Sequence, residues 1–247
     1  MKEVPTPDRV VAALRAEHFD MKVTPELEAA IAAVGRRALS SLGVDMSFNI
    51  RNPLTKEYLD GWREVKLKGI NRTTSDALRD RLAKAQQEGG GIEDMVQEIG
   101  AYFDGISGAR AELIARTEAV SSANGANLAA WELSGIVEGK EWLSALGQSD
   151  PRPDHEAMNG KTAKMGEMFT LPNGATTSAP GQFGDPSEDC NCHCTILPKL
   201  DEKAAPVDKA AVWRAFMDDV NETDARLLKA VRAAFEAQRA DCLAALK

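Results

Sequence analysis

Aromatic residues are scarce in this chain of 247 residues: Phe, Trp and Tyr make up 5% of it, while hydrophobic residues as a whole reach 43% and charged residues 28%. That composition is ordinary for a globular protein and excludes a wholly disordered or a collagen-like chain. No uninterrupted apolar run approaches the ~18–20 residues that a membrane-spanning helix needs. The first residues also lack the apolar core of a secretory signal. We therefore expect a soluble protein that is made and kept in the cytoplasm and has no membrane partner.

Positive charge is in short supply as well. The formal net charge is -8, which is the wrong sign for a protein that coats nucleic acid with its whole surface. A local excess lies between Arg51 and Gly91, where nine Lys and Arg residues accompany six Asp and Glu. A solvated helix face with mixed charges explains this excess most simply, and contact with DNA phosphates is the alternative.

The chain has only four cysteines, and they are unevenly placed. Cys190, Cys192 and Cys194 lie within five residues, whereas Cys242 stands alone near the end. A disulfide framework spreads its cysteines along the chain to close loops, and this set does not. The cluster therefore indicates reduced thiols or metal ligands. Cys242 is most simply a buried helix residue.

Helical periodicity covers most of the chain, and alanine-rich stretches favour helix over sheet. Thr24-Pro25 is a good N-cap and first-turn pair, and the polar run 73–76 precedes another apolar-periodic segment. The spacing predicts helices that begin at Pro7, at Thr24 and after residue 76, and further helices over residues 55–68, 92–103 and 109–133. We expect three consecutive regions: an N-terminal helical region at 1–70, a central domain at 71–200 and a C-terminal helical hairpin at 201–247.

The character of the sequence changes at Gly135. Residues 136–143 predict a short strand, and the stretch from Gly147 through Pro198 holds most of the prolines and many glycines. We call the segment Gly135–Pro198 the lobe. The expected fold class is α+β, mainly helical, with this small irregular Cys- and His-containing lobe, and a large parallel sheet is not expected. Trp142 is the one large aromatic in the strand-like stretch, so we expect it to be buried where the lobe meets the long helix.

Two further groups of residues are candidates for a role in the lobe. Arg116 and Glu118 lie two apart on the long helix and do not form a simple surface pair, so we expect them to organise the lobe by hydrogen bonds to its backbone.

Thiolate and imidazole nitrogen are preferred zinc ligands, and an irregular segment gains most from a metal that joins its ends. His155 with Cys192 and Cys194, and Cys190 as fourth ligand, are the predicted structural zinc site. His193 could replace Cys190, and metal-free thiols packed around His155 are the competing interpretation.

Short motifs in a fixed order resemble a known family. They are Thr73-Thr74, a Gly-rich break, Ala-Arg-Thr-Glu at 115–118, Ser-Gly-x-Val before Trp142, Arg-Pro-x-His at 152–155, Asn-Gly at 159–160 and Asn-Cys-x-Cys at 191–194. The segment from about Asn71 to Pro198 resembles the minor head proteins of tailed bacteriophages, typified by phage Mu protein F. That family usually has arginine where this chain has His193, and Cys190 is an additional cysteine. Residues 213–246 look like a helical hairpin often found upstream of the family's core, which raises the alternative of a piece of a longer or rearranged chain.

The resemblance implies a non-enzymatic protein carried in few copies in the phage head beside the portal. Its implied role is in head morphogenesis, DNA packaging or DNA delivery, and its implied partners are the portal protein, the major capsid protein or both, with weak contact to phage DNA. It would be found in the host cytoplasm during assembly and then in the virion, at the portal vertex or in the capsid interior.

One alternative function is that of a metal-dependent hydrolase or nuclease built on His155, Glu118 and the cysteines. The other is a nonspecific DNA-binding module that uses the basic region.

Overall fold

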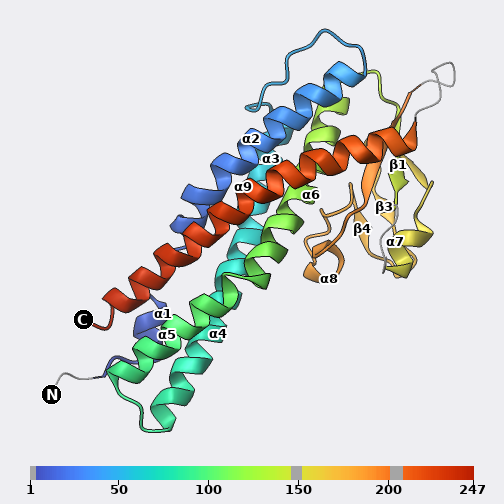
Figure 1. The fold of residues 1–247 in the computed structure, drawn as a ribbon. Helices are drawn as coiled ribbons and strands as arrows, with labels where there is room; N and C mark the ends of the chain where they lie inside the picture. The colour runs from blue at the N-terminus through green and yellow to red at the C-terminus, as the bar shows by residue number, and fades with distance from the viewer. Residues whose placement is uncertain (1–3, 146–151, 201–207) are drawn as a thin grey trace. The chain divides into compact units, whose positions relative to one another are not determined.

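The computed structural model describes residues 4–145, 152–200 and 208–247, and it is α+β and mainly helical, as predicted (Figure 1). The chain forms two compact units, each built from separate stretches of sequence. Unit 1 comprises residues 1–25, 60–112 and 228–247, and unit 2 comprises residues 26–59 and 113–227. The expected boundary between residues 70 and 71 falls inside a helix, so the three consecutive regions expected from the sequence are not the units of this fold.

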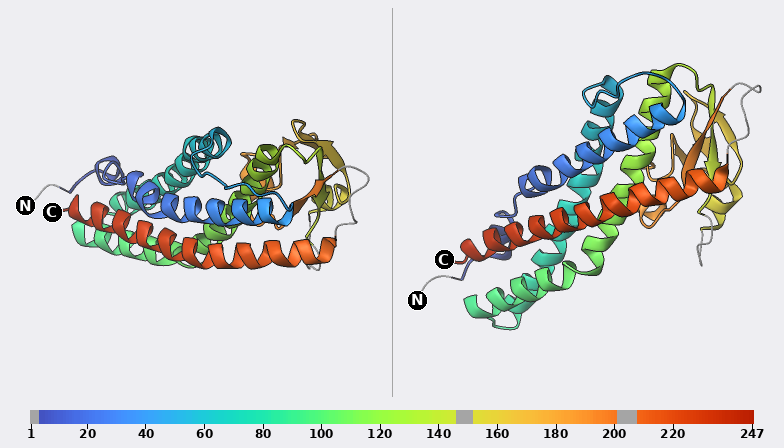
Figure 2. Two further views of the ribbon diagram at one scale, coloured as in Figure 1. Left: turned by 90° about the horizontal axis from the view of Figure 1, so that it is seen from above. Right: turned by 45° about the horizontal axis from the view of Figure 1, so that its top comes forward.

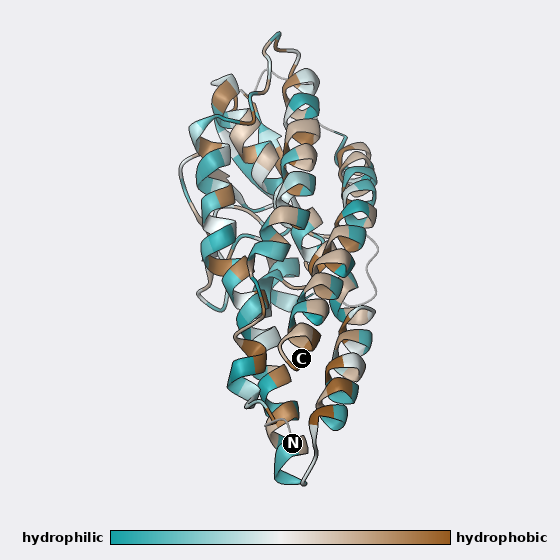
Figure 3. Ribbon diagram, turned by 90° about the vertical axis from the view of Figure 1, so that its left-hand side faces the viewer, coloured by the Kyte–Doolittle hydropathy of each residue, from teal (hydrophilic) through white to brown (hydrophobic). Residues whose placement is uncertain are grey.

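Unit 1 is helical. It contains α1 (Pro7–Val11), the first turns of α2 (Glu17–Ser41), the π-helical segment η1 (Trp62–Leu67), α4 (Lys68–Gln87), α5 (Ile92–Ile106) and the last turns of α9 (Lys209–Ala244). Hydrophobic and hydrophilic residues alternate around these helices (Figure 3), and the hydrophobic ones form the core. Phe19 and Phe235 meet edge to face there, with ring centroids 5.1 Å apart. Cys242 is fully buried in this unit, as expected.

Unit 2 combines helices with all the strands that the structure describes. Its helical part includes α3 (Pro53–Gly61), the remaining turns of α2 and α9, and α6 (Ala109–Ser134) from Leu113 onward. Small side chains such as Ala115, Ala119, Ala123 and Ala126 are buried along α6. They let other backbone approach this helix closely, and Gly181 uses that space: a Cβ there would lie 3.3 Å from the Cα of Ser121.

The lobe begins after α6 and packs beside it (Figures 1 and 2). A three-stranded antiparallel sheet has the order β2-β1-β5, formed by β1 (Gly139–Leu143), β2 (Thr162–Lys164) and β5 (Thr195–Lys199). A two-stranded ribbon joins β3 (Phe169–Thr170) and β4 (Thr176–Thr177), and two short helices complete the lobe, α7 (Pro153–Ala157) and α8 (Pro186–Asp189). The change of character predicted at Gly135 is therefore confirmed.

Two helix boundaries predicted from local signals are wrong. α2 runs through Pro25, and the Thr24 hydroxyl donates to the Asp20 carboxylate 2.7 Å away instead of capping a new helix. α4 likewise runs through residues 73–76, where the hydroxyls of Thr73 and Thr74 donate to carbonyls four residues earlier. In both places the continuous buried face on either side outweighs the local capping signal.

The predicted C-terminal hairpin is wrong as well. α9 is one continuous helix of 36 residues. Its sequence contains neither glycine nor proline, and the buried residues Phe216, Val220, Leu227 and Val231 keep one helical face without interruption. Residues 201–207 of the predicted hairpin lie outside the described residues.

No helix in the described ranges is both long and apolar enough to cross a membrane.

Candidate metal centre

Three potential metal ligands meet in the interior of the lobe. His155 lies on α7, and Cys192 and Cys194 lie just before β5. The Nδ1 atom of His155 is 3.5 Å from the sulfur of Cys192 and 3.8 Å from that of Cys194. All three ligand atoms lie within 4.8 Å of one another, and the residues are only 2%, 2% and 5% exposed. Two segments far apart in the sequence therefore form one buried cluster of soft donors.

The end of β1 fixes the position of α7. The Ser144 hydroxyl donates to the carbonyl of His155 at 2.8 Å, and the Ser144 amide donates to the Asn159 side chain at 3.1 Å. The Gly160 amide donates to the Trp142 carbonyl, with Gly160 at φ +80°, a conformation that glycine adopts readily. The Asn-Gly motif thus turns the chain after α7 and ties it back to β1.

The second ring nitrogen of His155 is held by a carboxylate. Its Nε2 lies 2.9 Å from Glu188 Oε2, and the Asn173 side-chain amide donates to the other oxygen of Glu188 at 2.8 Å. This carboxylate therefore fixes the orientation of the ring, so that Nδ1 points toward the sulfurs.

Backbone hydrogen bonds shape the cysteine-containing loop. Arg152 donates to the carbonyls of Glu188 and Cys190, and the Asp189 carboxylate accepts from the amides of Phe183 and Gly184, both at 2.9 Å. Asn191 has φ 55°, the left-handed conformation that asparagine tolerates better than most residues. These contacts turn the chain so that Cys192 and Cys194 approach the same imidazole.

The helix α6 supports this loop from its buried side. The Asn191 amide donates to the Thr117 hydroxyl at 3.4 Å. The Asn124 amide donates to the carbonyls of Pro180 and Cys194, both at 3.0 Å, and its oxygen accepts from the Thr195 hydroxyl at 2.8 Å. The Ala-Arg-Thr-Glu motif and the Asn-Cys-x-Cys motif are thus joined directly, through Thr117 and Asn191.

Aromatic rings enclose the cluster. Trp142 is completely buried, in agreement with the expectation from the sequence, and it meets His155 and Phe169 edge to face at centroid distances of 5.5 and 5.4 Å. Phe183 stacks on His155 at 5.6 Å. The low polarity around the sulfurs and the ring strengthens electrostatic interactions among them.

The pKa values of His155, Cys192 and Cys194 are all shifted, and the two thiols shift in opposite directions. Burial by itself would lower the pKa of His155, but hydrogen bonds to Cys194 and Glu188 outweigh it and raise the pKa. A hydrogen bond from Cys192, and after it the one from His155, holds the pKa of Cys194 well below the usual thiol range. The pKa of Cys192 is raised correspondingly, first by that same hydrogen bond to Cys194 and then by burial. Cys194 is therefore the more readily deprotonated thiol of the pair, and the same contacts favour the protonated form of the His155 imidazole.

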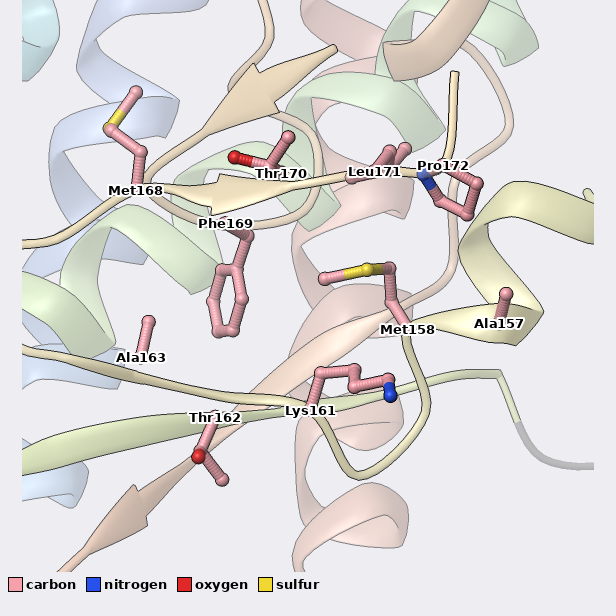
Figure 4. A pocket seen from close by; sticks show the side chains of 10 residues that line it. All are labelled: Ala157, Met158, Lys161, Thr162, Ala163, Met168, Phe169, Thr170, Leu171 and Pro172. Carbon is pink, nitrogen blue, oxygen red and sulfur yellow. The ribbon is translucent and has the colours of Figure 1, made fainter. Parts of the chain in front are cut away.

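A thiolate beside an imidazole that a carboxylate orients is also the geometry of a cysteine nucleophile. A nucleophile must meet its substrate, however, and both sulfurs are buried. A neighbouring pocket of 340 Å³ is lined by residues 157–158, 161–163 and 168–172, and neither cysteine is among them (Figure 4). Within it the Met158 thioether points toward the Phe169 ring (Figure 4). The burial of both sulfurs thus favours a structural role for this cluster over a catalytic one.

The segment that carries these motifs matches a family model. Residues 76–197 match the model of the phage Mu protein F like protein. This segment belongs to the phage Mu protein F-like family. The Mu F-like segment therefore includes α5, α6 and nearly the whole lobe.

Two curated proteins are similar to parts of the chain. The minor head protein GP7 of Bacillus phage SPP1 is 28% identical over 131 residues, which cover 52% of this chain and 42% of that protein. The NAD(+)–arginine ADP-ribosyltransferase EFV of Enterococcus faecalis (strain ATCC 700802 / V583) is 35% identical over 101 residues, which cover 41% of this chain and 20% of that enzyme. The chain thus spans about two fifths of one relative and one fifth of the other. No solved structure is significantly similar to it.

Not every predicted site residue of the Mu F-like segment joins the cluster. Among the described residues, Cys190 is outside the group of three ligand atoms, so the structure does not supply the fourth ligand expected from the sequence. His193 is not in that group either. Burial lowers the pKa of His193, and the Arg116 cation lowers it further.

The role predicted for Arg116 needs correction, and the surroundings of Glu118 differ from those of Arg116. Within the residues that the structure describes, Arg116 makes no hydrogen bond to the lobe backbone: its guanidinium lies 2.7 Å from Asp224 and donates to Asn221 at 3.1 Å, both on α9. Residues two apart on a helix point in different directions, and Arg116 points toward α9. Glu118 is buried near the Tyr58 phenol, where its charge adds to the effect of burial in raising the pKa of Tyr58.

Sequence reasoning missed the residues that hold the ligands in place: Thr117, Asn124, Arg152, Glu188 and Asp189. Asn124 lies among the alanines of a helix face, and this was one signal in the sequence. An asparagine on a face that packs against other elements must find hydrogen-bond partners there, because a buried amide needs them. Glu188 and Asp189 directly precede the first cysteine, but their roles depend on a tertiary contact with α7 and on the turn at Phe183.

Most of the basic side chains over residues 60–91 have acidic partners. Arg63 pairs with Asp20 and Asp60, Arg79 with Asp8 and Asp76, and Lys68 with Glu64. Arg81 and Lys84 also have acidic partners. These pairs match the interpretation of this stretch as a helix face with mixed charges.

Proposed function

We propose that this protein is a structural component of a tailed-phage head, a minor head protein that acts in head morphogenesis. The observation that carries the proposal is the Mu F-like segment itself, because its motif residues build one buried framework. Thr117 on α6 accepts a hydrogen bond from Asn191 of the lobe, and Asn159 and Gly160 bind the end of β1. His155 and Trp142 form the interior of the lobe. Motif residues used in this way maintain the shape of the lobe, as the proposed structural role requires.

The similarity to GP7 of phage SPP1 supports the same role. We infer that the partners are other head components, with the portal protein as the first candidate and the major capsid protein as the second. The location would then be the host cytoplasm during assembly and afterwards the virion, at the portal vertex or in the capsid interior. DNA contact, if it contributes during packaging or delivery, would be weak and salt-sensitive because the net charge is -8.

The relative from Enterococcus faecalis bears the name of an enzyme, and this chain spans one fifth of that enzyme. We propose a non-enzymatic role, because His155, Cys192 and Cys194, the potentially reactive groups of the Mu F-like segment, are buried inside the lobe. Incubation of the protein with labelled NAD⁺ and an arginine-containing acceptor should give no transfer of label. Transfer above that of a heat-inactivated sample would contradict this part of the proposal.

The decisive experiment uses the phage that encodes the protein. An amber mutation in its gene should reduce the yield of filled, infectious heads, and expression of the protein from a plasmid should restore the yield. Mass spectrometry of purified particles should detect the protein in the virion, and affinity capture from infected cells should recover the portal protein with it. Normal heads and normal infectivity in the amber mutant, with no protein in wild-type particles, would refute the proposed function.

A further inference from the structure

We propose that His155, Cys192 and Cys194 bind one zinc ion that holds the two ends of the lobe together. The site goes beyond the proposed function, since neither the family description nor the named relatives include a metal. The ligand atoms are His155 Nδ1 and the two sulfurs.

The separations of the ligand atoms match those of a zinc site. Zinc binds sulfur at about 2.3 Å and histidine nitrogen at about 2.0–2.1 Å, so two such ligands in a tetrahedron lie about 3.6 Å apart. The observed distances from Nδ1 to the sulfurs of Cys192 and Cys194 are 3.5 and 3.8 Å. Both separations are therefore close to those expected around one shared zinc ion.

The surroundings of the ligands also suit a metal. A zinc-bound histidine usually donates its other N–H to a carboxylate or carbonyl, which fixes the ring and strengthens it as a ligand. Glu188 occupies that position at 2.9 Å from Nε2, and Asn173 holds Glu188 in turn. Two thiolates balance the charge of the ion, so the buried centre would be electrically neutral.

The place of the cluster in the chain explains what the ion would contribute. His155 and Cys192 are separated by 36 residues, and the strands β3 and β4 between them have two residues each. Such short strands provide little cooperative stability of their own. A metal that joins α7 to the start of β5 closes this segment and stabilises it relative to the unfolded chain.

Cys190 is not required for this site, because its sulfur is outside the cluster. Three protein ligands leave the fourth position of a tetrahedral zinc ion to a water molecule. This assignment distinguishes the proposal from the four-ligand site expected from the sequence, and it can be tested separately.

The first test is the metal content of the full-length protein, purified with reductant and without a metal-chelating step. Elemental analysis should find about one zinc per chain, and chelator should lower the thermal midpoint. Reconstitution of the apoprotein with Co²⁺ should produce thiolate-to-cobalt charge-transfer absorption, a signature that metal-free thiols cannot give. Less than about a tenth of an equivalent of zinc, with no cobalt signature and melts that ignore chelator, would overturn the proposal.

The second test compares cysteine variants. Cys192→Ala and Cys194→Ala should lose zinc and the cobalt signature, whereas Cys190→Ala and the matched control Cys242→Ala, a buried cysteine in unit 1, should retain both. Loss of zinc from Cys190→Ala would overturn the three-ligand assignment, and retention in Cys192→Ala and Cys194→Ala would overturn the site. The wild-type cobalt spectrum does not depend on whether any variant folds. None of these measurements involves the phage head, so failure here is distinguishable from failure of the proposed function.

Discussion

At the scale of single residues, the lobe depends on a few buried side chains that each serve several contacts. Trp142 contacts His155, Phe169 and Phe183, and Asn124 binds three backbone or hydroxyl groups of the lobe. Because so few side chains carry so many contacts, their removal should be far more costly than that of their neighbours in sequence.

We expect Trp142→Ala to lower the free energy of unfolding by about 3–5 kcal/mol, because it removes a fully buried aromatic and leaves a cavity. Urea unfolding followed by circular dichroism measures the change. The exposed residue Ile136 provides a control within the lobe, and Ile136→Ala should cost less than about 1 kcal/mol. Equal midpoints for the two variants would contradict the central position of Trp142.

Asn124→Ala should destabilise unit 2 by about 2–4 kcal/mol, since it leaves the carbonyls of Pro180 and Cys194 buried without this donor. Asn127 is on the same helix and half-buried, so Asn127→Ala is a matched control with an expected cost of less than about 1 kcal/mol. Hydrogen exchange of the amides in β5 should accelerate only in the Asn124 variant. Unchanged exchange there would show that Asn124 does not hold the lobe to α6.

Lys140 gives a pH dependence with a defined sign. Its side chain is 1% exposed and donates to the Ser178 carbonyl, and burial lowers the pKa of its ammonium despite the nearby carboxylates of Glu132 and Glu167. Between this lowered pKa and the ordinary lysine value the unfolded chain binds more protons, so the stability contributed by Lys140 increases as the pH rises. The urea midpoint of the wild type should therefore rise relative to Lys140→Met as the pH increases from neutral toward the ordinary pKa of lysine. A constant difference would show that the ammonium is not desolvated.

At the scale of secondary-structure elements, a continuous buried helix face outweighs local helix-breaking and helix-capping signals. α2 passes through Pro25 and α4 through a cluster of capping residues, yet the buried residues on both sides keep helical spacing. Local signals are worth about 1 kcal/mol each, whereas one buried leucine contributes about 2 kcal/mol.

The interior proline of α2 should therefore lower the stability of the protein, and the buried residues of the helix offset this loss. Pro25 is exposed and cannot donate a hydrogen bond to the carbonyl of Met21. Pro25→Ala should raise the free energy of unfolding by about 1–3 kcal/mol in a thermal or urea melt. A decrease in stability would show instead that the helix needs the bend that proline imposes.

At the scale of the whole molecule, the acidic net charge limits contact with nucleic acid. Within residues 60–91, ion pairs join five of the basic side chains to acidic partners. We expect retention on a DNA column at about 50 mM salt to be weak and to disappear by about 200 mM, because few phosphates are neutralised. Retention that survives the higher salt would favour the DNA-binding alternative.

The sequence by itself determined the fold class, the position of the lobe and the order of the motifs. Composition and periodicity are local properties, and they suffice for a long amphipathic helix such as α6 or for the change of character at Gly135. His155 and the cysteine pair were recognisable in the same way, because soft ligands at two ends of an irregular segment are visible along the chain.

Only the tertiary structure decided which of those residues meet. It brought His155 to Cys192 and Cys194, left Cys190 outside the cluster and turned Arg116 toward α9. It also showed that Asn124 binds Cys194, 70 positions away, and that Glu188 binds His155, 33 positions away. Such contacts depend on the directions of side chains on packed elements and on loop conformations such as the left-handed Asn191, and these are set by the free energy of the whole core rather than by neighbours in sequence.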